Sequence, residues 1–150
     1  MTEVLFYHLQ NMTLESVLPP LLEKSLERGW RVVVQSTSRE RADALDGHLW
    51  TYRDDSFLPH AIWSAGDAQD QPIVLAIEDI NPNGAEVRFL IDNAAFPADS
   101  ERYERMVVVF DGEDDDALAT ARTAWTDCKA RGFDVTYWQT DERGRWQRRE

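Results

Sequence analysis

The sequence has little cysteine, histidine or glycine in the arrangements that common sites require. Its one cysteine, Cys128, excludes an internal disulfide and a cysteine cluster for zinc. The three histidines, at positions 8, 48 and 60, lack the spacing of metal ligands. Seven glycines are scattered along the chain, and no two are spaced as in a dinucleotide- or phosphate-binding loop. These absences argue against a zinc protein and against a nucleotide-sensing domain.

Long apolar runs and basic residues are also scarce. No run approaches the ~20 apolar residues needed to span a bilayer, and residues 1–3 lack the basic start of a signal peptide. We therefore expect a cytoplasmic protein that does not contact the membrane. The chain carries 16 Lys and Arg against 28 Asp and Glu, a net charge of −12. Such an acidic protein is not expected to bind nucleic acid directly through its phosphates.

The few cations are unevenly distributed. Residues 121–150 carry a net charge of +2, whereas residues 1–120 carry −14. An acidic protein with one basic corner is better suited to a protein partner than to nucleic acid. The partner surface is therefore expected near the C-terminal end of the sequence.

Short apolar segments alternate with amphipathic ones, which predicts a single α/β domain over residues 1–150. We expect three layers: a mostly parallel sheet with helices on both faces, Rossmann-like but without a nucleotide site. Strands are predicted at residues 3–9, 31–35, 73–77, 87–91, 106–110 and 135–138, and helices begin near residues 14, 38 and 117. A turn is expected at residues 81–84, and residues 141–150 form a polar tail in which Trp146 is the only large apolar anchor.

Two local patterns refine this prediction. Pro19 and Pro20 lie inside the first helical pattern, so a kink or a late start of the regular helix is expected. Residues 26–32 and 129–135 share the order helix, Arg-Gly, aromatic residue, strand. Both helices are therefore expected to end at the glycine of this pattern.

The last helix combines a small apolar face with a neighbouring cationic stripe. Arg122, Trp125 and Lys129 fall within an arc of roughly 60° at about 100° per residue. One interpretation is a boundary core tryptophan beside solvated cations; the other is a surface for an acidic peptide that carries an apolar side chain. The face turned to the sheet consists of Ala117, Ala121, Ala124 and Cys128.

Two other stretches invite functional hypotheses. Residues 50–63 are predicted to be irregular and are rich in aromatic side chains, which fits either a satellite hydrophobic cluster or an exposed patch awaiting a partner. The acidic run at residues 111–116 fits capping of the last helix. Its alternative interpretation is a Mg²⁺ site, which would make the protein a small metal-dependent enzyme.

The sequence resembles the chi subunit of bacterial DNA polymerase III over nearly its whole length. The resemblance rests on four segments: Phe6-Tyr7-His8-Leu9, Leu22-Glu23-Lys24 leading to Arg28-Gly29-Trp30-Arg31-Val32, Leu49-Trp50-Thr51-Tyr52 with Ser56-Phe57-Leu58-Pro59-His60, and Trp125 with residues 129–133. It implies a non-catalytic clamp-loader adaptor without a cofactor. One surface of such a protein binds the psi subunit, and another binds the acidic C-terminal tail of single-stranded-DNA-binding protein, which ends in Pro-Phe.

The resemblance also implies which residues bind each partner. Arg122, Trp125 and Lys129 match the family's tail-binding positions, whereas Trp50 and Phe57 match positions on the psi side. Thr126 stands where the family pattern has a further lysine. We expect either a weaker tail affinity or compensation by Arg131 and the basic residues 143–149.

Overall fold

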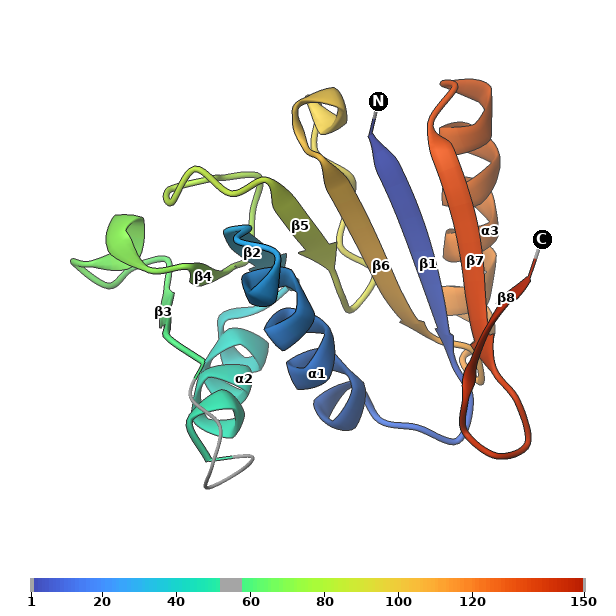
Figure 1. Ribbon diagram of the computed structural model, residues 1–150, viewed down its shortest axis with the longest axis horizontal. Helices are drawn as coiled ribbons and strands as arrows, with labels where there is room; N and C mark the ends of the chain where they lie inside the picture. The colour runs from blue at the N-terminus through green and yellow to red at the C-terminus, as the bar shows by residue number, and fades with distance from the viewer. Residues whose placement is uncertain (1, 52–57, 150) are drawn as a thin grey trace.

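The computed structural model describes residues 2–51 and 58–149 (Figure 1). Its helices are α1 (Leu14–Glu27), α2 (Arg39–Thr51) and α3 (Asp115–Ala130), with 3₁₀ turns at Ala68–Asp70 and Ser100–Arg102. Its strands are β1 (Glu3–Leu9), β2 (Val32–Gln35), β3 (His60–Ile62), β4 (Ile73–Ala76), β5 (Val87–Leu90), β6 (Arg105–Asp111), β7 (Asp134–Thr140) and β8 (Trp146–Arg149). Within these residues no helix is long and apolar enough to cross a membrane.

In the described part of the chain, the strands form one sheet in the order β3-β4-β2-β5-β6-β1-β7-β8. All neighbouring pairs are parallel except β7 and β8, which are antiparallel. Every residue of β2 is buried, as expected for a valine-rich strand covered on both faces. The predicted α/β class with a mostly parallel sheet is confirmed.

The helices lie on both faces of the sheet, which gives three layers (Figure 1). One core cluster joins α1 and α2 to the face that carries Val32, Val34 and Leu75. A second joins α3 to the opposite face, through Phe6 and Met106 among others. Among the described residues, no helix covers β1, β7 and β8 on the face that carries α1 and α2 (Figure 1).

The prolines of α1 do not delay its start, because the helix runs unbroken from Leu14. A proline at position 19 cannot donate to the carbonyl of Glu15, four residues earlier. His48 of α2 fills this vacancy: its Nε2 lies 2.8 Å from the Glu15 carbonyl oxygen. The side chain of Glu15 also binds Arg41 of α2, with 2.6 Å between Oε1 and Nη1.

The two Arg-Gly-aromatic segments end their helices as predicted. Gly29 and Gly132 adopt φ values of +80° and +83°. The amides of Trp30 and Phe133 then donate to the carbonyls of Ser25 and Cys128, each at 3.1 Å. This is the Schellman pattern of helix termination.

A turn forms within residues 81–84, as predicted, and it lies between the parallel strands β4 and β5, which β2 separates in the sheet. Two other details differ from the sequence-based expectation. The stretch 50–63 is not irregular throughout: its first two residues end α2, and residues 60–62 form β3. The polar tail forms strand β8, whose Trp146 packs on Tyr7 with 4.9 Å between ring centroids.

Candidate functional site on helix α3

Helix α3 is fixed at both ends, so its outer face has a defined orientation. Asp114 accepts hydrogen bonds from the amides of Asp116 and Ala117 at the N-terminus. Ala117, Ala121 and Cys128 are buried against the sheet, as predicted. Burial raises the pKa of the Cys128 thiol to about 11, which keeps the thiol protonated and agrees with a core role.

Trp125 lies at the edge of this buried face and contacts two other aromatic rings. Its ring meets Phe6 edge-on at a centroid distance of 5.7 Å and Tyr137 at 5.6 Å. Lys129 Nζ lies 5.1 Å from the Trp125 ring centroid, in cation–π geometry. The sequence indicated Trp125 but not Tyr137, which the two-residue period of β7 places on the same face as Val135.

Tyr137 is held in place by His8. The Tyr137 hydroxyl and His8 Nδ1 are 2.6 Å apart, and His8 also packs against Phe110. The ring of His8 leaves no room at Gly112, where an added Cβ would meet His8 Nε2 at 1.9 Å. His8 is therefore a packed boundary residue that supports the aromatic pair Trp125–Tyr137.

The charges around this pair are positive. Arg122 and Lys129 are exposed on the same side of α3, one turn to either side of Trp125. Burial lowers the pKa of His8, the charge of Asp111 raises it, and the charge of Arg122 lowers it again, with a net decrease. Burial raises the pKa of Tyr137, an effect that Arg122 partly offsets. We call Arg122, Trp125, Lys129 and Tyr137 the α3 site.

Arg131 is not part of this group. At about 100° per residue it lies roughly 180° around the helix from Arg122, toward the opposite edge of α3. There its guanidinium pairs with Glu101 and stacks over Phe133, with Cζ 4.8 Å from the ring centroid. The hollow beside Arg131 has a volume of about 360 Å³ and is lined by Phe96, Thr120, Thr123, Ala124, Asp127 and Cys128.

The other predicted partner surface lies far from the α3 site. Trp50 lies in the last turn of α2, at the β3 end of the sheet, whereas α3 covers the β1–β7 end on the opposite face (Figure 1). Trp50 is 50% exposed, and its ring centroid is 4.3 Å from that of His60. Phe57 lies outside the described residues.

The acidic run at residues 111–116 is engaged in backbone contacts. Asp111 accepts a hydrogen bond from the amide of Glu113 at 2.9 Å, and Asp114 caps α3. Throughout the described residues, no group of three or more His, Cys, Asp or Glu side chains is placed to hold a metal ion. Two of these carboxylates, those of Asp111 and Asp114, therefore accept hydrogen bonds from backbone amides at the start of α3.

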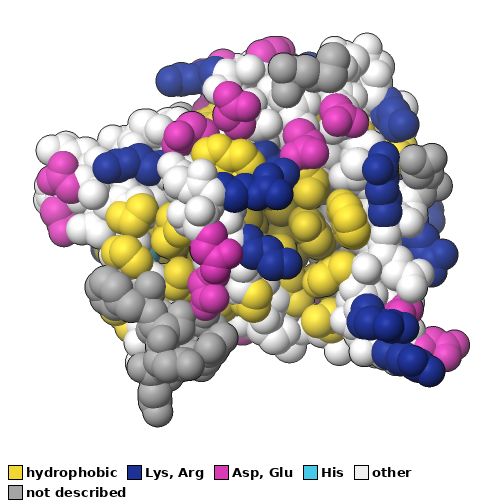
Figure 2. Space-filling model, in the orientation of Figure 1, with side chains coloured by type: hydrophobic (Ala, Val, Ile, Leu, Met, Phe, Trp, Pro, Cys, Tyr) yellow, Lys and Arg dark blue, Asp and Glu magenta, His cyan; other side chains and the backbone are white. Residues whose placement is uncertain are grey.

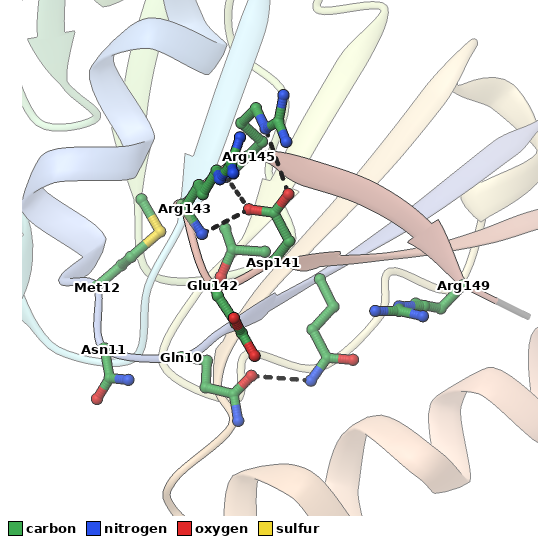
Figure 3. A pocket seen from close by; sticks show the side chains of 11 residues that line it. Gln10, Asn11, Met12, Asp141, Glu142, Arg143, Arg145 and Arg149 are labelled. Atoms are coloured by element: carbon green, nitrogen blue, oxygen red, sulfur yellow. Dashed lines mark hydrogen bonds and ion pairs between the residues drawn. The ribbon is translucent and has the colours of Figure 1, made fainter.

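A polar hollow lies at the carboxyl ends of β1 and β7, where doubly wound sheets often bind ligands (Figure 3). Its volume is about 790 Å³, and Gln10 and Gln139 are hydrogen-bonded across it at 3.0 Å. Asp141 accepts from the amides of Arg143 and Arg145, each at 2.9 Å, and so closes the β7–β8 turn. The turn after β1 has no glycine, so it lacks the backbone cradle of a phosphate site.

Known proteins match this chain over most of its length. The sequence model of the family described as "DNA polymerase III chi subunit, HolC" matches residues 1–136. The chain belongs to the DNA polymerase III chi subunit family. The resemblance seen in the sequence is confirmed.

Two curated relatives carry the same subunit name. The "Probable DNA polymerase III subunit chi" of Rickettsia prowazekii is 30% identical over 91 residues, which cover 61% of this chain and 55% of the relative. The "DNA polymerase III subunit chi" of Pseudomonas aeruginosa is 25% identical over 90 residues, which cover 59% of this chain and 62% of the relative. The matched stretch thus spans little more than half the length of these chi relatives.

Proposed function

We propose that the protein is a non-catalytic accessory subunit of DNA polymerase III that works in cytoplasmic DNA replication. It would connect the clamp loader, through a psi-type partner, to the acidic C-terminal tail of single-stranded-DNA-binding protein. Membership of the chi family supports the replication role. The placement of the α3 site and Trp50 at opposite ends of the sheet is compatible with two partners bound at once (Figure 1).

The observation that carries the tail-binding proposal is the aromatic pair Trp125–Tyr137 between two cations. A Pro-Phe terminus offers an apolar ring and a terminal carboxylate, and the residues before it offer side-chain carboxylates. The ring would pack beside Trp125, while Arg122 and Lys129 lie one turn to either side and would bind the carboxylates. Lys129 already lies over the Trp125 ring, so charge and apolar surface are adjacent.

Most of the affinity is expected from the apolar contact. Exposed ion pairs contribute on the order of 0–1 kcal/mol each, whereas burying a phenylalanine side chain contributes about 1.5–3 kcal/mol. Charge-assisted hydrogen bonds to the terminal carboxylate would add to this. The expected dissociation constant is micromolar and rises with salt concentration.

Arg131 has a smaller role in this proposal. It lies on the opposite edge of α3 and is paired with Glu101, so it would act on a tail mainly through its distant charge. Trp50 and Phe57 are proposed for the psi-type partner, since a half-exposed tryptophan is a typical anchor of a protein interface.

Fluorescence anisotropy with a labelled acidic peptide ending in Pro-Phe tests the tail site. We expect micromolar binding to the wild type and at least a tenfold loss, about 1.4 kcal/mol, in Trp125→Ala and Lys129→Ala. Lys24→Ala removes an exposed lysine from the other face of the sheet and is the matched control, with affinity unchanged. Arg131→Ala is expected to lower the affinity less than Lys129→Ala does.

Three outcomes would contradict parts of this proposal. Binding that survives Trp125→Ala and Lys129→Ala would keep the adaptor role but place the tail elsewhere. A larger loss in Arg131→Ala than in Lys129→Ala would move the site to the hollow beside Phe96. No binding at low salt would remove the tail function from this chain.

A further inference from the structure

The uncovered part of the α1–α2 face carries an aromatic cluster of Tyr7, Trp138 and Trp146. Tyr7 stacks on Trp138 with a centroid distance of 6.2 Å and an interplanar angle of 14°. Trp146 meets the Tyr7 ring edge-on, with 4.9 Å between the ring centroids. All three side chains are partly exposed. In Figure 2, hydrophobic side chains gather in the middle of this face, with both Lys or Arg and Asp or Glu side chains around them.

A groove continues from this cluster between α1 and strands β1 and β6. Its volume is about 440 Å³. The apolar side chains that line it are Leu5, Tyr7, Leu21, Phe89 and Val107, and the charged ones are Lys24, Glu27, Arg28 and Arg105. Leu5, Phe89 and Val107 are buried, so the apolar surface left in the groove comes from the partly exposed Tyr7 and Leu21. Three of the four charged side chains at its border are cations.

Two of the border cations form no ion pair within the part of the chain that the structure describes. Among the described residues, neither Lys24 nor Arg28 has a carboxylate within ion-pair distance, although the chain carries 28 Asp and Glu. Arg28 and Arg105 instead lie over Trp30, at 5.1 and 4.9 Å from its ring centroid, and Arg105 also pairs with Glu3. In a strongly acidic protein, cations left without acidic partners around an apolar groove complement an acidic group from outside.

We infer that this groove binds an acidic amphipathic helix of a partner protein, which would lie beside α1 and extend the helical layer over β1. Parallel sheets bury both faces under helices, and a helix with side chains is about 10–12 Å wide. Its apolar stripe would contact Tyr7 and Leu21, while flanking carboxylates would reach the exposed Lys24 and Arg28. The inference is independent of the tail-binding proposal, because α3 lies on the opposite face.

Other occupants fit the charges less well. A second copy docked through the same face by two-fold symmetry would bring the cationic border against its own copy. A nucleic acid strand would meet the field of a protein with net charge −12.

Isothermal titration calorimetry of the full chain with a designed helical peptide tests the inference. The peptide carries one Leu/Phe stripe flanked by Glu, and a matched peptide carries Lys at every Glu position. We expect the acidic peptide to bind at least tenfold more tightly than the basic one. Lys24→Glu and Arg28→Glu are each expected to weaken it about three- to tenfold, whereas Arg39→Glu, at an exposed position on α2 that does not line the groove, leaves it unchanged.

Several results would overturn the inference. Equal binding of the two peptides, or no loss in Arg28→Glu, would exclude a groove that selects an acidic helix. Displacement of the acidic peptide by a thymidine 20-mer would reassign the face to single-stranded DNA. Self-association in analytical ultracentrifugation that Arg28→Glu abolishes would reassign it to a second copy. The tail-binding proposal is tested separately, with the Pro-Phe peptide and the Trp125→Ala variant. A negative result with the helical peptide therefore leaves that proposal intact.

Discussion

His8 is held in an environment that favours its neutral form. Burial lowers its pKa below the ordinary value of 6.5, against the raising effect of Asp111 and with a further decrease from Arg122. Because the folded-state pKa is depressed, neutral His8 contributes to the free energy of unfolding. This contribution is fully present above pH 6.5 and is lost as the pH falls through the lowered pKa. The ring thereby links the packing of the α3 site to pH.

We therefore predict that His8→Gln makes the decline in unfolding free energy between pH 7 and pH 5 shallower than in the wild type. Urea denaturation at several pH values measures this slope. Tyr137→Phe removes the hydrogen bond to His8 but leaves the ring to titrate, so its slope should stay close to that of the wild type. Identical slopes for wild type and His8→Gln would contradict the prediction.

Arg88 is fully buried and bonded to neutral acceptors from several segments. Its guanidinium donates to Gln35 Oε1 from Nε at 2.9 Å and from Nη2 at 2.6 Å. It also donates to the carbonyls of Ile80 at 2.7 Å and Glu78 at 2.8 Å and to the Tyr103 hydroxyl at 3.1 Å. The side chain therefore ties the loop after β4 to the sheet.

We predict that Arg88→Lys lowers the free energy of unfolding by about 2–4 kcal/mol, because an ammonium group cannot reproduce the planar fork and leaves buried acceptors unpaired. Arg39→Lys, at an exposed position on α2, is the matched control and should change stability by about 0.5 kcal/mol or less. Chemical denaturation of both variants measures the difference. Equal effects would mean that the guanidinium geometry does not matter.

At the scale of elements, α1 and α2 depend on each other through a bond that a proline makes necessary. His48 donates to the Glu15 carbonyl, which Pro19 leaves without its helical donor.

We predict that His48→Ala lowers the free energy of unfolding by about 1 kcal/mol in the wild type and by less in a Pro19→Ala background, where residue 19 has an amide that can bond to Glu15. A double-mutant cycle by thermal or urea unfolding measures this coupling. Purely additive effects would show that the two residues act separately.

The sequence predicted elements well where burial follows a regular pattern. Strand β1 was predicted over residues 3–9, where the structure places it, because its apolar residues are buried in the middle of the sheet. The ends of α1 and α3 at Gly29 and Gly132 were also predicted, because glycine is favoured where a helix ends in a residue with positive φ. The helix predicted to begin near residue 38 begins at Arg39, and Ser38 Oγ accepts a hydrogen bond from the Arg41 amide.

Contacts between distant segments were harder to predict. β8 is short, polar and at the edge of the sheet, so only its pairing with β7 and the contact of Trp146 with Tyr7 define it. The stripe of Arg122, Trp125 and Lys129 follows from helical spacing alone. The supporting His8–Tyr137 bond joins residues 129 positions apart. Helical periodicity also could not show that Glu101 pairs with Arg131, since Glu101 belongs to another element.

At the scale of the whole molecule, the charge asymmetry sets two opposing forces on an acidic tail. Local cations at Arg122 and Lys129 attract it, whereas the rest of the chain, with a net charge of −14 over residues 1–120, repels it. The two forces differ in range. At about 0.01 M ionic strength the Debye length is roughly 30 Å, so the distant acidic groups act on an approaching peptide; at about 0.5 M only contacts within a few ångströms remain.

This difference in range leads to a prediction about distant residues. Glu40 and Asp70 are exposed, and both belong to the α2–β4 end of the molecule, away from α3 (Figure 1). We expect Glu40→Gln combined with Asp70→Asn to raise the association rate of the acidic Pro-Phe peptide about twofold at low salt, and to have no effect at about 0.5 M salt. Lys129→Gln should weaken binding at both salt concentrations, because it removes a direct contact. Stopped-flow fluorescence measures these rates, and an equal effect of the distant pair at both salt concentrations would show that it acts through the structure of the site instead of its field.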